Sequence, residues 1–152
     1  MAIENRSHSP FEGRWRWLSR VILSCLYAMA GILHLTVPAP FLTIMPEWVP
    51  HPQIVVAITG VYEVVGAVGL LMPRLRRSAG WLLAIYAICV FPANIKHAII
   101  DLTSVTGGLG PWYHFPRLLL QPVIVWWALY ASEILSWPCA KQSRRTSVLD
   151  AE

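Results

Sequence analysis

The stretch "ITGVYEVVGAVGLLMPRLRRSAGWLL" (residues 58–83) decides the fold, because a short basic turn joins two long apolar segments within it. The turn is "MPRLRRS" (72–78), and it carries three arginines. A helix of about 20 apolar residues is long enough to cross a bilayer. We therefore predict two antiparallel membrane helices that are direct neighbours, joined on one side of the membrane.

The composition extends this reading to the whole chain. Of the 152 residues, 56% are hydrophobic and only 13% are charged, whereas charged residues make up about 25% of an average soluble domain. Four segments are apolar enough to cross a bilayer, and they cover about residues 17–37, 53–72, 78–100 and 115–135. We predict an all-α integral membrane four-helix bundle.

The domain boundaries follow from these spans. The bundle should occupy residues 15–137, which leaves no room for a separate soluble domain. Residues 1–14 are polar, and residues 138–152 form a basic tail. Both terminal segments are expected to be disordered, because they contain too few apolar residues to form a core.

The basic residues predict the orientation of the spans. Most of the twelve Lys and Arg residues precede the first span, join the second to the third, or follow the fourth. The other two connections, 38–52 and 101–114, contain none. Cytoplasmic loops carry the excess of Lys and Arg. Both termini should therefore be cytoplasmic, and the protein should be a multi-pass protein of the plasma (inner) membrane. The positive charge is explained by this topology and does not indicate a nucleic-acid partner.

The polar residues inside the spans gather in their outer half. A charged side chain at mid-bilayer costs about 2.5–3.5 kcal/mol on insertion scales, so each one needs a reason. With about 1.5 Å of rise per residue, Glu63 lies deepest, about 10–15 Å from the outer face. Because Cβ atoms tilt toward the N-terminus of their own helix, the shallow and deep groups can meet in one layer. The residues concerned are His34, Glu63, Asn94, Lys96, His97, Arg117 and Gln121.

Each of these residues has a functional and a structural interpretation. Glu63 is the candidate catalytic residue, as a proton carrier, or alternatively the partner of Arg117 in an ion pair. The predicted ligand-binding residues are His34, Asn94, His97, Arg117 and Gln121. Alternatively the histidines are packing groups, Asn94 and Gln121 join helices, and Arg117 anchors the fourth span. No metal site is predicted, because neither H-x-x-x-H nor E-x-x-H occurs.

Helical phase separates Lys96 from its neighbours. It lies two residues from Asn94, about 200° around the helix, so it should point away from the layer and reach the outer headgroups. Pro92 removes a backbone hydrogen bond and frees the carbonyl of Ile88, which predicts a kink beside Asn94.

Several segments resemble the DoxX family of small four-span membrane proteins. They are "AGILHLTVPAPF" (30–41), the stretch 58–83, "FPANIKHA" (91–98) and "FPRLLLQPVIVWWALY" (115–130). The resemblance implies the four-span fold and an association with quinone-linked or redox-stress complexes, although most members have no established activity. Members often have proline where this chain has Leu119. The cysteine pair of related four-helix thiol oxidoreductases is absent, so disulfide chemistry is not expected.

Two functions follow from these observations. The first is a quinone-linked or redox accessory subunit, in which the polar layer binds a quinone head and Glu63 carries protons. Its partners would be membrane redox subunits or further copies of the chain. The alternative is a non-enzymatic binding or assembly protein for a lipid, a small hydrophobic molecule or a partner subunit. No self-contained catalytic motif decides whether the chain is an enzyme. Transport is a weaker third reading, because no inverted repeat is present.

Overall fold

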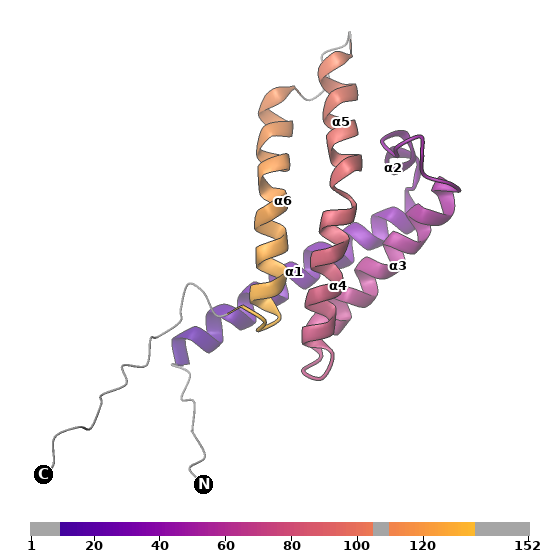
Figure 1. Ribbon diagram of the computed structural model, residues 1–152. Coiled ribbons are helices and arrows are strands. Elements are labelled where there is room, and N and C mark those ends of the chain that lie inside the picture. Colours follow the sequence, from indigo (N-terminus) through magenta and orange to yellow (C-terminus); the bar gives the residue numbers. More distant parts are fainter. Residues whose placement is uncertain (1–9, 105–109, 136–152) are drawn as a thin grey trace, which may run out of the picture.

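The computed structural model describes residues 10–104 and 110–135, and every regular element within them is a helix (Figure 1). The helices are α1 (Pro10–Thr36), α2 (Ala39–Thr43), α3 (Pro52–Leu71), α4 (Arg76–Cys89), α5 (Phe91–Thr103) and α6 (Pro111–Ala131). The all-α prediction is therefore confirmed for the described part of the chain.

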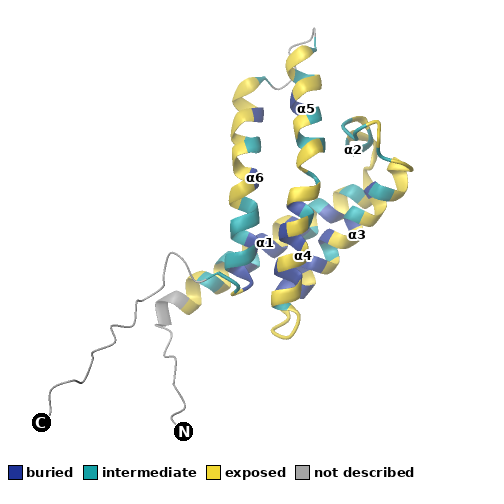
Figure 2. Cartoon of the chain, in the orientation of Figure 1, coloured by how far each residue is buried: buried dark blue, intermediate teal, exposed yellow. Residues whose placement is uncertain are grey.

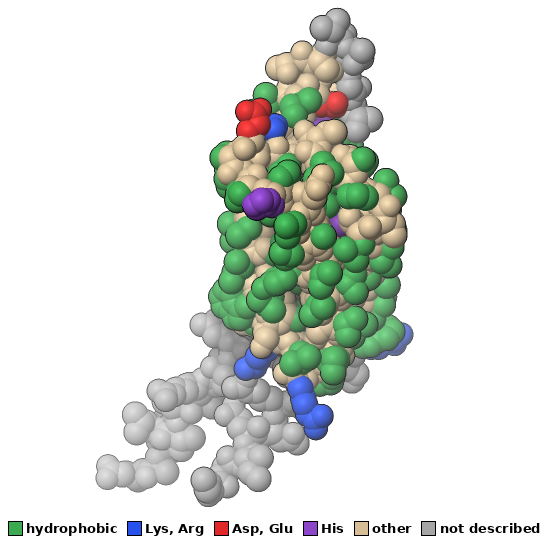
Figure 3. Space-filling model, turned by 90° about the vertical axis from the view of Figure 1, so that its right-hand side faces the viewer, with side chains coloured by type: hydrophobic (Ala, Val, Ile, Leu, Met, Phe, Trp, Pro, Cys, Tyr) green, Lys and Arg blue, Asp and Glu red, His purple; other side chains and the backbone are tan. Residues whose placement is uncertain are grey.

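Three helical segments are long and apolar enough to cross a membrane. They are Gly13–Thr36, Pro52–Leu71 and Arg76–Thr103, the last of which combines α4 and α5. Much of their surface is exposed (Figure 2), and Figure 3 shows a broad band of hydrophobic side chains with most of the visible Lys and Arg side chains at one end. Large exposed apolar surfaces are unusual for a soluble monomer. The prediction of membrane-type helices is confirmed for these three segments.

Helix α6 covers most of the predicted fourth span but is not among these three segments. It begins at Pro111, four residues before the predicted start, and ends at Ala131, four residues before the predicted end. Arg117, Gln121 and two internal prolines reduce its hydropathy. Its assignment as a fourth span, and with it the four-helix membrane bundle, stays a prediction.

Helix α1 starts earlier than the sequence predicts. It begins at Pro10 and so includes residues 10–14, which we expected to be disordered. Proline fits the first turn of a helix, because its missing N–H would have no intrahelical partner there. The predictions for residues 1–9 and for the tail 138–152 fall outside the described residues.

The packed helices have a closed half and an open half. We call the end that contains the α3–α4 turn and the C-terminus of α6 the closed half, and the end that contains α2 and α5 the open half. Dark, buried positions concentrate where α1, α3, α4 and the end of α6 meet, whereas α5 and the start of α6 are mostly exposed or half-buried (Figure 2). Helix α5 packs mainly against α6.

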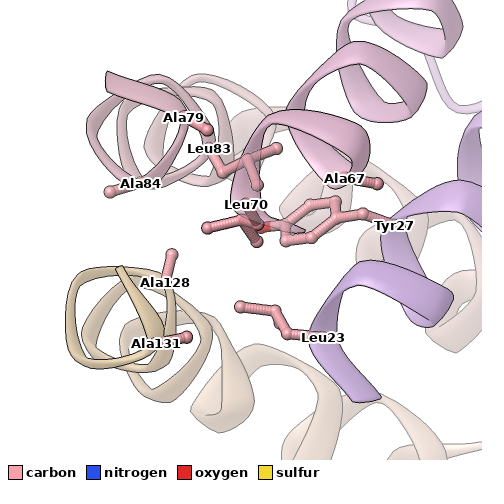
Figure 4. Close-up of a cluster of buried hydrophobic side chains, with 9 residues drawn as sticks. All are labelled: Leu23, Tyr27, Ala67, Leu70, Ala79, Leu83, Ala84, Ala128 and Ala131. Carbon is pink, nitrogen blue, oxygen red and sulfur yellow. The ribbon is translucent and has the colours of Figure 1, made fainter. Parts of the chain in front are cut away.

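The closed half contains the hydrophobic core (Figure 4). Its members are Leu23, Tyr27, Ala67, Leu70, Ala79, Leu83, Ala84, Ala128 and Ala131. Small residues dominate, so the helix backbones approach closely, which favours van der Waals packing between helices in lipid. A Cβ added at Gly80 would lie only 2.2 Å from the Cβ of Ser132. Only glycine fits at this crossing of α4 and the end of α6.

An ion cluster fastens the same half. The guanidinium of Arg20, which is 6% exposed, donates to Ala131 O at 3.0 Å and to Glu133 Oε1 at 2.8 Å. Arg76 donates to the same carboxylate oxygen at 2.8 Å. Glu133 thus joins the first turns of α4 to α1 and to the chain that follows α6.

The third predicted span is interrupted where proline predicts it. Helix α4 ends at Cys89 and α5 begins at Phe91, with Pro92 in its first turn. Val90 lies between them, and its N–H still bonds to Tyr86 O at 3.0 Å. This confirms that the helix is disturbed beside Asn94.

Candidate functional site

A cavity of about 1030 Å³ occupies the open half. Residues of α1 and α3 line one part of it, residues of α4, α5 and α6 line another, and the segment 41–49 covers it. Most lining side chains are apolar, and the polar ones fall into two groups. Ligand sites in proteins commonly have this character, with a few polar groups set into an apolar wall.

Glu63 is the centre of the first polar group. Its side chain comes from α3, and the residue is only 5% exposed. Tyr86 Oη donates to Glu63 Oε1 at 2.9 Å, and His34 Nδ1 lies 3.0 Å from Glu63 Oε2. The same His34 nitrogen lies 2.9 Å from Ala30 O. Because Nδ1 carries at most one hydrogen, it cannot fully satisfy both oxygens.

The result is a buried carboxylate oxygen without a well-formed hydrogen bond, on a residue that lines the cavity. Glu63 Oε2 has no hydrogen bond of good geometry within the described part of the chain, although the His34 nitrogen is close. The ring of His34 stacks on Phe41, with centroids 3.8 Å apart, so it is held in place. A buried polar atom without a full partner is uncommon in proteins and needs a reason.

The second polar group joins α4, α5 and α6. Arg117 Nη2 donates to Asn94 Oδ1 at 2.7 Å, and Arg117 Nη1 contacts His97 Nδ1 at 2.5 Å. Asn94 Nδ2 donates to Gln121 Oε1 at 3.1 Å. Gln121 Nε2 donates in turn to Ala87 O, a carbonyl beside the break between α4 and α5. Asn94 and Gln121 therefore do join helices, as the structural interpretation proposes.

The alternative role of Glu63, an ion pair with Arg117, is wrong. Glu63 pairs with His34 and Tyr86, whereas Arg117 contacts Asn94, His97 and the ring of Tyr113. The expected polar layer is divided into two groups with different partners. Five of the six predicted site residues line the cavity, and His97 does not.

Lys96 also differs from its predicted role. Its Nζ donates to Met45 O at 2.5 Å, so in this structure it does not point freely toward headgroups. Met45, Pro46, Trp48 and Val49 line the cavity. Lys96 therefore fastens the covering segment 41–49 to α5, although it lies off the polar layer, as helical phase predicts.

The sequence analysis missed Tyr86, a member of the first polar group, and Asp101, which lies outside both groups. The sequence does not mark Tyr86 as a site residue, because a tyrosine within an apolar span is common. The spacing of Asp101 could have marked it, since it lies four residues after His97, on the same face of α5. Asp101 Oδ2 lies 2.8 Å from His114 Nε2, and His114 is 1% exposed. The two described cysteines, Cys25 and Cys89, are free.

Comparison with known proteins gives one match. Residues 23–132 match the family described as "Domain of unknown function (DUF8561)". No curated protein and no solved structure matches this chain. The likeness to the DoxX family stays a prediction. Because the match covers most of the chain, and includes both polar groups and the covering segment, the chain belongs to the family of the domain of unknown function DUF8561.

Proposed function

We propose that this chain is a four-span protein of the plasma membrane with both termini cytoplasmic and the open half in the outer leaflet. Three membrane-length apolar helices support this, as does α6, whose 21 residues extend about 30 Å. Arg74, Arg76 and Arg77 at the α3–α4 turn support a cytoplasmic closed half.

Within this topology, the chain binds an amphipathic membrane molecule whose polar head is a quinone or quinol. The observation that carries the proposal is Glu63, a buried carboxyl residue that lines a large apolar cavity and has one oxygen without a well-formed hydrogen bond among the described residues. A quinol hydroxyl is a donor of the kind that such a carboxyl group binds. The guanidinium of Arg117 and the amide of Asn94 also line the cavity and offer donors to a quinone carbonyl.

The apolar lining suits the rest of such a molecule. Side chains such as Leu26, Val55, Leu120 and Ile124 line the cavity and would contact an isoprenoid tail. Burial of apolar surface contributes about 25 cal/mol per Å². The tail would therefore supply affinity, and the polar groups would fix the position of the head.

The proposed role in redox chemistry is an accessory one. Reduction of a quinone consumes two electrons and two protons, and this sequence has no redox-cofactor motif to supply the electrons. They would come from a partner redox subunit. Glu63, with His34 and Tyr86 against it, would pass one of the two protons to a quinone oxygen, and the second proton would come from water. The resemblance to the DoxX family supports this role.

Fluorescence quenching tests the proposal directly. Trp48, Trp112 and Trp127 line the cavity, so a bound quinone should quench their emission. The full chain in lipid nanodiscs would be titrated with a short-tailed benzoquinone. We expect saturable quenching, and Glu63→Gln should weaken the affinity about 10- to 100-fold, because it replaces a charged hydrogen-bond acceptor by an amide.

Glu47→Gln is the matched control, since Glu47 is exposed and does not line the cavity. It should bind as the wild type does. Linear, unsaturable quenching that is equal in all three proteins would overturn the proposal. If native mass spectrometry instead finds a retained phospholipid that Glu63→Gln releases, the alternative of a lipid-binding protein replaces the quinone assignment.

A further inference from the structure

Three metal-ligating side chains meet where the far end of α5 approaches the first turns of α6. His97 and Asp101 come from α5, and His114 comes from α6. One ligand atom from each residue lies within 4.8 Å of the other two. The rings of His97 and His114 are edge to face, with centroids 5.1 Å apart. This cluster does not depend on Glu63 or on the first polar group.

The sequence expectation of no metal site rested on spacing within single helices. The spacing here is H-x-x-x-D on α5, and the third residue comes from another helix. His97 and Asp101, four residues apart, share one face of α5. Pro111 begins α6, so that His114 falls in its first turns, opposite this face. Only the fold brings the three together.

The donor set has a defined chemical preference. Two imidazole nitrogens and one carboxylate oxygen suit borderline divalent ions such as Zn²⁺ and Co²⁺. Ligand atoms lie about 2.0–2.2 Å from such an ion, hence roughly 3.5 Å from one another. The widest pair in the cluster needs to close by about 1 Å, which small side-chain rotations can provide.

The protonation state of His97 also suits a metal. A guanidinium donates hydrogen bonds and accepts none, so the contact from Arg117 Nη1 makes His97 Nδ1 an acceptor. With Nδ1 as the acceptor, that nitrogen carries no hydrogen, which is the form in which an imidazole nitrogen binds a metal.

The environment of His114 points to an incomplete site. His114 is almost completely buried, but its Nδ1 has no hydrogen-bond partner within residues 10–104 and 110–135. A histidine that serves only in packing normally has both nitrogens satisfied. Its Nε2 already faces the carboxylate of Asp101.

We propose that His97, Asp101 and His114 bind a divalent transition-metal ion, with at least one coordination position left to solvent or a ligand. The guanidinium of Arg117 opposes the ion, because it is a second cation in contact with His97. Binding of the ion would shift Arg117 away from His97, while its contact with Asn94 can remain. Arg117 therefore weakens metal binding.

Cobalt binding tests the site without any need for a quinone. The full chain, purified with a tag free of histidine and stripped with a chelator, would be titrated with Co²⁺ and followed by its visible absorption. We expect one ion per chain in a low-symmetry nitrogen–oxygen site. Asp101→Asn and His97→Gln should each weaken binding about 10-fold or more, and Arg117→Gln should tighten it several-fold.

His51→Asn is the matched control. His51 is exposed, lies outside the cluster and has φ 50°, a conformation that asparagine tolerates. Thermal unfolding of each variant would show whether it is folded. If Asp101→Asn does not fold, His97→Gln alone tests the site. Equal Co²⁺ binding by the wild type and His97→Gln, or weaker binding by Arg117→Gln, would overturn the proposal.

Discussion

The closed and open halves of this protein pack their helices in different ways. In the closed half, alanines and glycines bring α1, α3, α4 and the end of α6 into contact, and Gly80 leaves no room for a Cβ. In the open half, the helices surround a cavity of about 1030 Å³. We infer that the closed half supplies most of the free energy of folding. The open half can therefore tolerate a polar group without a well-formed hydrogen bond.

The charged residues repeat this contrast. Arg20 is buried, and its guanidinium is paired with a carboxylate and a backbone carbonyl. Glu63 is equally buried, but one of its oxygens has no well-formed hydrogen bond among the described residues. The first arrangement stabilises a fold, and the second is typical of a site that awaits a ligand. Substitutions should therefore have opposite effects in the two halves.

The largest expected effect is in the closed half, at Gly80. Gly80→Leu places a side chain against Ser132 and should destabilise the protein by about 3 kcal/mol, in spite of a helix-propensity gain of about 1 kcal/mol. Thermal unfolding in detergent measures this. Gly13→Leu is the control, because nothing lies within 4 Å of a Cβ at that position. Equal melting temperatures for the two variants would show that the α4–α6 contact is not close.

The ion cluster should give the next largest effect. Glu133→Gln leaves Arg20 buried without its charged partner and should cost about 1–2 kcal/mol, at the lower end because the Glu133 side chain is 43% exposed. Quinone quenching should be unchanged. A loss of binding with no loss of stability would contradict the division between the two halves.

Glu63→Gln should give the reverse pattern. We expect the free energy of unfolding to stay within about 1 kcal/mol of the wild type or to rise, since a buried carboxylate with an unsatisfied oxygen is removed. Quinone binding should fall, as proposed above. The pair of variants, Glu133→Gln and Glu63→Gln, measured for both properties, therefore tests the contrast in both directions.

The smallest effect is expected at Lys96. Lys96→Met removes the bond to Met45 O and should change stability by less than about 1 kcal/mol. Asn94→Ala should cost more, because it removes one hydrogen bond of Arg117 and one of Gln121. Hydrogen exchange should increase in the covering segment 41–49 for Lys96→Met. Arg74→Gln, at the exposed α3–α4 turn, is the control. Unchanged exchange in this segment would mean that Lys96 does not fasten it.

The sequence predicted the parts of this structure that depend on one helix at a time. Hydropathy located α1, α3 and the α4–α5 segment, and proline located the interruption near Val90. Depth and helical phase gathered five of the cavity residues, and they separated Lys96 from Asn94.

The pairing of side chains needed the lateral arrangement of helices, which the sequence does not specify. Glu63 and Arg117 were expected to meet in one polar layer, but Glu63 contacts His34 and Tyr86, and Arg117 contacts Asn94 and His97. Tyr86 became the partner of Glu63 because α4 packs beside α3. The cluster of His97, Asp101 and His114 likewise depends on how the ends of two helices meet.

Photoaffinity labelling with an azidoquinone gives the most direct test of quinone binding in the cavity. The full chain in nanodiscs would be irradiated with the probe, and the modified residues would be mapped by mass spectrometry. We predict adducts on cavity residues such as Tyr86, Ala93 and Leu120, which competing quinone and Glu63→Gln both suppress. Adducts spread over exposed apolar residues such as Val65 and Val68, and equal in wild type and Glu63→Gln, would contradict the account.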